Sequence, residues 1–196
     1  MRYAELERNT KETKIHMKLT LDNDKTGQLI GTSGIGFFDH MLNSFCVHGK
    51  FIIDLEMAGD INVDGHHTVE DIGIVLGKLF NNIMGEKIGI KRYGSSYVPM
   101  DEALCLTVVD ISGRPYLVYD VPVSSQSIGN YDTQLTKEFF YALASNMNVT
   151  LHINLIYGDN DHHITEAVYK SAARAISEAC KIETGNSEIL SAKGVL

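Results

Sequence analysis

A five-residue motif, His-His-x-x-Glu, occurs twice in this 196-residue chain, at positions 66–70 and 162–166. Neutral imidazole and carboxylate donors together suit divalent manganese, iron, zinc or nickel. Neither motif has a cysteine beside it, which argues against a structural zinc site built on thiolates. Two copies of one ligand spacing in a single chain therefore predict both a site with more than one metal ion and a duplicated fold.

Helical geometry is expected to direct the two histidines of each motif to different ions. Each motif opens an apolar run of helical period, after an acidic turn in which Asp64 and Asp161 are predicted N-caps. The first histidine and the glutamate stand four residues apart and can chelate one ion together, whereas adjacent residues diverge by about 100°. Two such helices could form two metal sites, each with a His–Glu pair from one helix and a lone histidine from the other. A neighbouring subunit is the simplest cover for these outward ligands, which predicts a homo-oligomer.

The same periodicity predicts the buried side of both helices. The inward positions are Val69, Ile72, Leu76, Leu79, Phe80 and Ile83 in the first helix and Ile164, Val168, Ala172, Ala175, Ile176 and Ala179 in the second. The motif side chains point away from these stripes. A histidine held inside the core of its own helix therefore fits the pattern poorly.

The duplication extends beyond the two motifs. Residues 39–45 and 137–143 share one apolar pattern, and each places a potential ligand, His40 or Glu138, at its second position. Strand-like runs flank these segments at 13–21, 51–57, 104–111 and 149–155. Each half therefore reads β-β-α-β-α, with the metal motif opening its last helix.

These halves predict the fold class and the domain organisation. We expect an α+β fold in which two sheets pack with helices about a pseudo-twofold axis. Residues 1–93 would form the first half and residues 94–196 the second. Together the two halves would make one compact domain.

Composition narrows the class of protein. The net charge of −8 provides no basic surface for nucleic acid or membrane, although a few local cations can still bind a small anion. No apolar run approaches the roughly 20 residues that span a bilayer, and the polar N-terminus does not resemble a signal peptide. Cys46, Cys105 and Cys180 are scattered in apolar surroundings, as expected of buried thiols in a reducing cytoplasm. We therefore expect a cytoplasmic protein.

Three cations lie in turn-like segments where phosphate groups are often bound. Arg92 lies near the join of the two halves, Arg114 in the turn at 112–115, and Lys193 near the C-terminus. The arginine fork matches phosphate geometry, and loops commonly carry binding residues. Each cation taken alone is equally typical of a solvated surface charge.

Taken together, the motifs resemble the imidazoleglycerol-phosphate dehydratase family. The resemblance runs from about Glu7 to the C-terminus. Its segments are Lys11-Glu12-Thr13, Phe38-Asp39-His40-Met41-Leu42, His48-Gly49, residues 65–72, Lys91-Arg92-Tyr93-Gly94, Asp101-Glu102-Ala103-Leu104, Ser112-Gly113-Arg114-Pro115, residues 131–135, residues 161–167 and Ser191-Ala192-Lys193-Gly194. Gly36 and Gly65 depart from residues common in the family, without removing a group that the chemistry needs.

The resemblance implies a carbon–oxygen lyase that dehydrates D-erythro-imidazole glycerol phosphate to imidazole acetol phosphate in histidine biosynthesis. It implies two manganese ions per active site, between subunits of a 24-subunit shell built from trimers. Carried over by position, one ion would take His40, His67, His162 and Glu166, and the other His66, Glu70, Glu138 and His163. Some members of the family have histidine at the position of Glu138, so an oxygen donor here would replace an imidazole.

The resemblance also implies a mechanism. The substrate ring, held on manganese as imidazolate, would expel the adjacent hydroxyl through a diazafulvene-like intermediate, and the resulting enol would tautomerise to the ketone. Glu12 is the predicted proton-transferring base, although a surface glutamate on a strand would look the same in the sequence. The predicted substrate contacts are His48, Arg92, Arg114, Ser191 and Lys193, all but His48 assigned to the phosphate.

Two other functions share parts of this pattern. A di-metal phosphoesterase would also combine paired ions with phosphate-binding cations, but it would release inorganic phosphate. A non-catalytic scaffold could use His–Glu motifs only to join subunits. Glu12 and the three phosphate-type cations would have no function in such a scaffold.

Overall fold

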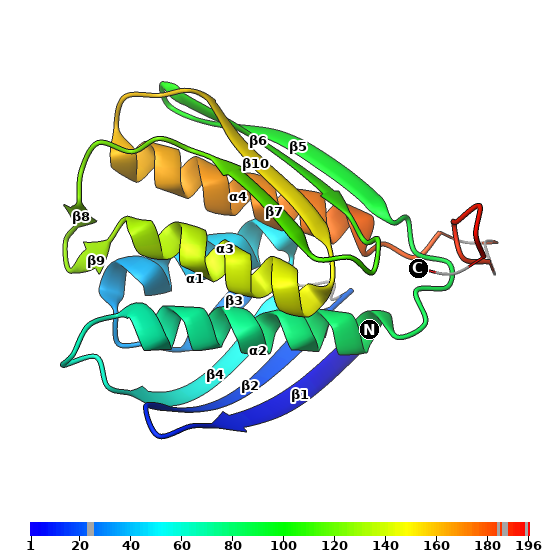
Figure 1. Cartoon of the computed structure of the whole chain (residues 1–196), viewed down its shortest axis with the longest axis horizontal. Helices are drawn as coiled ribbons and strands as arrows, with labels where there is room; N and C mark the ends of the chain where they lie inside the picture. Colours follow the sequence, from blue (N-terminus) through cyan, green and yellow to red (C-terminus); the bar gives the residue numbers. More distant parts are fainter. Residues whose placement is uncertain (23–25, 184, 186–187, 195) are drawn as a thin grey trace.

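The chain folds into two sheets with helices between them (Figure 1). The computed structural model describes residues 1–22, 26–183, 185, 188–194 and 196. The first half comprises β1 (Arg2–Asn9), β2 (Thr13–Leu21), β3 (Gln28–Gly31), α1 (Gly36–Gly49), β4 (Ile52–Gly59) and α2 (His66–Met84). The second comprises β5 (Tyr93–Met100), β6 (Ala103–Asp110), β7 (Tyr116–Asp120), β8 (Ser127–Ile128), β9 (Tyr131–Asp132), α3 (Gln134–Met147), β10 (Thr150–Tyr157) and α4 (Asp161–Ala179).

The two four-stranded sheets have the same topology. Their strand orders are β1-β2-β4-β3 and β5-β6-β10-β7, and in both the last pair is parallel while the other pairs are antiparallel. This repetition confirms the predicted α+β class with duplicated halves. Each half also contains a short edge strand, β3 or β7, that the β-β-α-β-α prediction lacks. The β8–β9 hairpin belongs to the second half.

Helices from opposite halves pack against each other. Helix α2 lies along α3, and α1 lies along α4, so each helix pair joins the two repeats (Figure 1). One continuous cluster of buried side chains fills the space between the sheets. The predicted inward faces of α2 and α4 belong to this core, except that Ile83 in the last turn of α2 is only half-buried.

The starts of the two motif helices differ in detail from the sequence prediction. Helix α2 has Gly65 as its N-cap, while the Asp64 carboxylate accepts the His66 amide at 2.7 Å. Helix α4 is capped by Asn160, whose side-chain oxygen accepts the His162 amide at 2.9 Å. Asp161 is already the first helical residue, and its carboxylate instead accepts amides of the preceding 124–125 loop. Both predicted N-caps are therefore wrong by one residue, because Gly65 takes the position expected for Asp64 and Asn160 the position expected for Asp161.

The three cysteines are buried and unpaired, as predicted. In the part of the chain that the structure describes, no helix combines the length and apolarity needed to cross a bilayer.

Close backbone approach between α2 and α3 depends on two glycines one turn apart. A Cβ added at Gly73 would lie 2.8 Å from the Phe139 carbonyl oxygen, and one added at Gly77 would lie 2.6 Å from the Leu143 carbonyl oxygen. These distances are shorter than carbon–oxygen packing allows. The glycines therefore set the spacing of the helix pair that links the halves.

Gly77→Ala is expected to destabilise the protein by about 1–3 kcal/mol, because the new methyl group must push α3 away. This strain should exceed the gain of roughly 1 kcal/mol that alanine normally gives a helix. The measurement is thermal unfolding at one fixed subunit concentration. Gly36→Ala in α1 is the control, since its Cβ would meet nothing within 4 Å. Equal melting temperatures for the two variants would contradict this account of the helix pair.

Candidate metal centre

Three potential ligands converge where α1 meets the first turn of α4. His40 comes from α1, and His162 and Glu166 are the i and i+4 members of the second motif. Glu166 Oε2 lies 3.3 Å from His162 Nε2 and 3.7 Å from His40 Nε2. The three donor atoms all lie within 4.8 Å of one another. That span is close to twice the bond of about 2.0–2.2 Å that such donors make to a divalent ion, so the group fits one.

The Glu166 carboxylate is held in its charged form. Only 11% of its side chain is exposed, and Lys170, one turn further along α4, donates to Oε1 at 2.6 Å. Burial acts to raise the pKa of Glu166, but the hydrogen bond and charge of Lys170, with the charges of His40 and His162, lower it overall. The group is thus an anionic donor at neutral pH, as a metal ligand must be.

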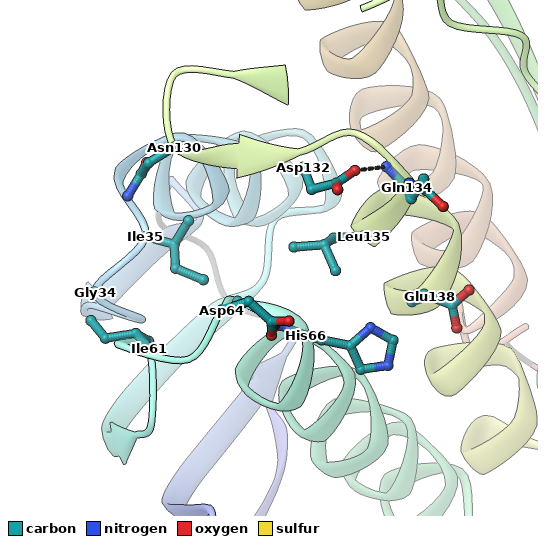
Figure 2. A pocket seen from close by; sticks show the side chains of 11 residues that line it. Gly34, Ile35, Ile61, Asp64, His66, Asn130, Asp132, Gln134, Leu135 and Glu138 are labelled. Atoms are coloured by element: carbon teal, nitrogen blue, oxygen red, sulfur yellow. Dashed lines mark hydrogen bonds between the residues drawn. The ribbon is translucent and has the colours of Figure 1, made fainter. Parts of the chain in front are cut away.

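The first motif forms a related but more open arrangement. His66 Nε2 and Glu70 Oε2 lie 3.9 Å apart in the first turn and a half of α2. His66 and Glu138 of α3 line a shared cavity of about 420 Å³, into which both side chains project (Figure 2). Among the described residues, only the His40, His162 and Glu166 group brings three donor atoms together. The His66–Glu70–Glu138 set is the pseudo-twofold counterpart with wider spacing.

The second histidine of each motif points elsewhere. The rings of His66 and His67 are inclined at 88°, and those of His162 and His163 at 80°. His67 Nδ1 lies 3.0 Å from Asp60, and His163 Nδ1 lies 2.7 Å from Glu102.

The helical divergence expected from the sequence therefore appears in the geometry. The first predicted ligand set consists of His40, His67, His162 and Glu166. Within a single chain His40, His162 and Glu166 lie together, and His67 lies apart beside Asp60. In the second predicted set, His66, Glu70, Glu138 and His163, the residue that lies apart is His163, which is hydrogen-bonded to Glu102.

The Glu12 carboxylate, the predicted base, lies beside one of these lone histidines. Its Oε1 atom is 3.8 Å from His67 Nε2, and about half of its side chain is exposed. The backbone here is fixed, because the Glu12 amide donates to Thr10 Oγ1 and the Glu12 carbonyl accepts the Asp60 amide. The structure thus brings Glu12 to the motif of its own half.

The predicted phosphate contacts lie far from the metal motifs of the same chain. The Arg92 amide bonds the carbonyl of Ala179, the last residue of α4, whereas His162 and His163 lie in the first turn of that helix. At a rise of 1.5 Å per residue, the two ends of α4 are about 25 Å apart. The C-terminus lies at this same end, away from β8 and β9 (Figure 1).

The local partners of these cations are defined. Arg92 Nε donates to Asp110 Oδ1 at 2.7 Å, which raises the pKa of Arg92, and Nη1 donates to the Leu190 carbonyl. That contact places the segment carrying Ser191 and Lys193 beside Arg92. Arg114 is exposed, and its backbone amide donates a hydrogen bond to Ser112 Oγ at 3.2 Å. None of these four residues reaches the His-His-x-x-Glu groups of its own chain.

His48 lines a separate, cationic cavity of about 500 Å³ with Arg174 and Lys181. Burial lowers the pKa of His48, and the charges of Lys170 and Arg174 lower it further. Sequence reasoning did not single out Lys170 or Arg174. The signal was present, because Glu166, Lys170 and Arg174 stand at i, i+4 and i+8 on one stripe of α4.

Comparisons with known proteins agree on one family. A family model described as imidazoleglycerol-phosphate dehydratase matches residues 33–176. Proteins of that description from Pelobacter propionicus and Caldicellulosiruptor saccharolyticus are 51% and 50% identical over 195 residues, covering 100% of this chain and 99% and 98% of theirs. The crystal structure of the Staphylococcus aureus dehydratase superposes with a TM-score of 0.83 at 38% identity, covering 92% of this chain and 99% of that one. The structure of IGPD from Pyrococcus furiosus gives 0.82 at 34% identity, covering 97% and 100%.

Glu166→Gln is expected to weaken Mn²⁺ binding by at least roughly 10–100-fold, because a neutral amide replaces the anionic carboxylate that lies beside both His40 and His162. The measurement is calorimetric titration of the metal-stripped protein. Glu86→Gln, at an exposed position beyond the end of α2, is the control and should bind as the unaltered protein does. Unchanged affinity in Glu166→Gln would remove this residue from the metal site.

Proposed function

The chain belongs to the imidazoleglycerol-phosphate dehydratase family, and from this premise we propose that it converts D-erythro-imidazole glycerol phosphate to imidazole acetol phosphate in histidine biosynthesis. The observation that carries the proposal is the convergence of His40, His162 and Glu166 on one point. The reaction is a hydro-lyase step that leaves the phosphate attached. We place it in the cytoplasm, with the other steps of small-molecule biosynthesis.

Two Mn²⁺ ions per site would fit the donors of this chain. His40, His162 and Glu166 would hold one ion and His66, Glu70 and Glu138 the other, each completed by a lone histidine, His67 or His163. When bound, manganese supplies Lewis acidity and a template that orients the imidazole ring of the substrate. Imidazole and carboxylate donors suit this ion, and the exchange of an imidazole for Glu138 adds an oxygen donor, which manganese accepts well.

The protein groups then have distinct tasks. Glu12 would take the carbon-bound proton, since its exposed carboxylate stands beside His67 on a fixed backbone. Arg92, Arg114, Ser191 and Lys193 would bind the phosphate, and His48 would contact the substrate. In this order the ionised ring would first expel the neighbouring hydroxyl, which takes up a proton and leaves as water. Loss of the carbon-bound proton to Glu12 would then give the enol, which would become the ketone.

One chain cannot supply all these groups to one substrate. Its phosphate-type cations and its metal motifs lie at opposite ends of α4, about 25 Å apart. A glycerol phosphate carrying an imidazole is much shorter than this separation. We therefore propose that neighbouring copies complete each site, and that the assembly is the 24-subunit shell built from trimers.

The direct test is incubation of the metal-stripped and the Mn²⁺-loaded protein with imidazole glycerol phosphate. We expect a metal-dependent product with a new enolisable carbonyl and with the phosphate retained. Release of inorganic phosphate would instead indicate a phosphoesterase. Metal binding and assembly with no turnover would indicate a scaffold.

Glu12→Gln is expected to keep the assembly and both ions but to lose turnover, because the amide cannot take a proton. Turnover, metal content and particle mass would be measured on the same preparation. Near-normal turnover would remove Glu12 from the role of base.

Mixing provides a control for the shared site. Glu12→Gln and Arg92→Ala chains, each inactive alone, should regain part of the activity when they are dissociated and reassembled together. Sites then form that take the base from one chain and the phosphate contact from another. No recovery in mixed particles would contradict the sharing of sites between subunits.

A further inference from the structure

The two halves of the chain place a glutamate at equivalent positions but use it differently. Glu12 immediately precedes β2, and Glu102 immediately precedes β6, the matching strand of the other sheet. Each lies near the second histidine of the motif in its own half. A duplicated chain would at first suggest two equivalent proton-transferring groups.

Both carboxylate oxygens of Glu102 are engaged. Oε2 lies 2.7 Å from His163 Nδ1. Oε1 accepts the Asn160 amide at 2.8 Å and the Asp159 amide at 3.4 Å. A carboxylate whose two oxygens both accept hydrogen bonds from the protein is a fixed acceptor, engaged by the groups around His163 rather than open to a substrate.

In the first half this task falls to another residue. His67 Nδ1 lies 3.0 Å from Asp60, which follows β4, and Glu12 approaches only the opposite ring nitrogen, Nε2, at 3.8 Å. In the second half the carboxylate on the Nε2 side is Asp101, 3.7 Å from His163. The carboxylate that binds Nδ1 therefore comes from a different place in each half. In the first half it follows β4, and in the second half it precedes β6.

The consequence is the same for both lone histidines. A ring whose Nδ1–H donates to a carboxylate presents the Nε2 lone pair on its other side, fixed in tautomer and orientation. Both rings would then offer Nε2 on the side away from the carboxylate that binds Nδ1.

We propose that Glu102 is the positioning residue that orients His163 to bind an ion through Nε2, and that it transfers no proton in the reaction. Asp60 has the same task for His67. This inference rests on the proposed function, because His163 needs an orienting partner only if it binds metal. The role is specific to one of the two ions, so its loss should affect that ion alone.

Glu102→Gln is the test. Glutamine has one acceptor oxygen, so it cannot receive both the His163 Nδ1–H and the backbone amides. We expect the metal-stripped variant to bind one Mn²⁺ per chain about 10–100-fold more weakly while the other binds normally. The ¹⁵N shifts of the His163 ring in the metal-free protein should also lose the single Nδ1–H tautomer. Glu102→Asp provides a second variant if glutamine prevents folding, because it keeps the charge while its shorter side chain draws the carboxylate away from the His163 ring.

Glu178→Gln is the matched control. Its two carboxylate oxygens likewise bind one side chain, Lys91, and one backbone amide, Ser95, but near the far end of α4. It should leave affinity for both ions unchanged. Normal affinity in Glu102→Gln together with lost turnover would overturn the proposal and make Glu102 a proton-transfer group. If the unaltered protein itself binds no Mn²⁺, the proposed function fails instead.

Discussion

The angle between consecutive side chains on a helix governs the organisation of this molecule. At the start of α4, His162 and Glu166 converge because they stand one turn apart, and the intervening His163 must point elsewhere. The start of α2 repeats the arrangement. Each chain therefore carries two groups of candidate ligands on one side of its motif helices and two lone histidines on another. Carboxylates hold both lone rings in these orientations.

The core explains why these groups stay in place. Helix α4 lies between a sheet and α1, so even Glu166, which has a charged side chain, is largely enclosed. An enclosed carboxylate needs a compensating charge, and Lys170 provides one from the next turn. The cross-packing of α1 on α4 and of α3 on α2 also means that each ligand group draws on both halves. Neither half could build a ligand group by itself.

The sequence was most informative where the structure is local. The i,i+4 pairs, the motif helices and their buried faces follow from periodicity alone, and the resemblance of the halves predicted two matching layers. The short strands β3 and β7 escaped prediction because their few residues carry no alternating pattern and are ordered by pairing with β4 and β10. The contact between Glu102 and His163 joins residues far apart in the chain, and no local signal separates Glu102 from Glu12. Lys170 and Arg174 could have been found from their helical spacing to Glu166.

The opposite placement of cations and ligand groups has a consequence for assembly. If one substrate touches both, each contact must bring one end of a chain against the other end of its neighbour, an arrangement that a twofold pair, a ring or a closed shell can provide. An ion shared across such a contact stabilises the assembly as well as the substrate complex, because it binds only where two chains meet. Removing metal should then weaken subunit contacts and activity together. If the lone histidines complete the shared sites as proposed, they would couple the two effects, because carboxylates orient their rings before assembly and little rotational freedom is lost when the ion binds.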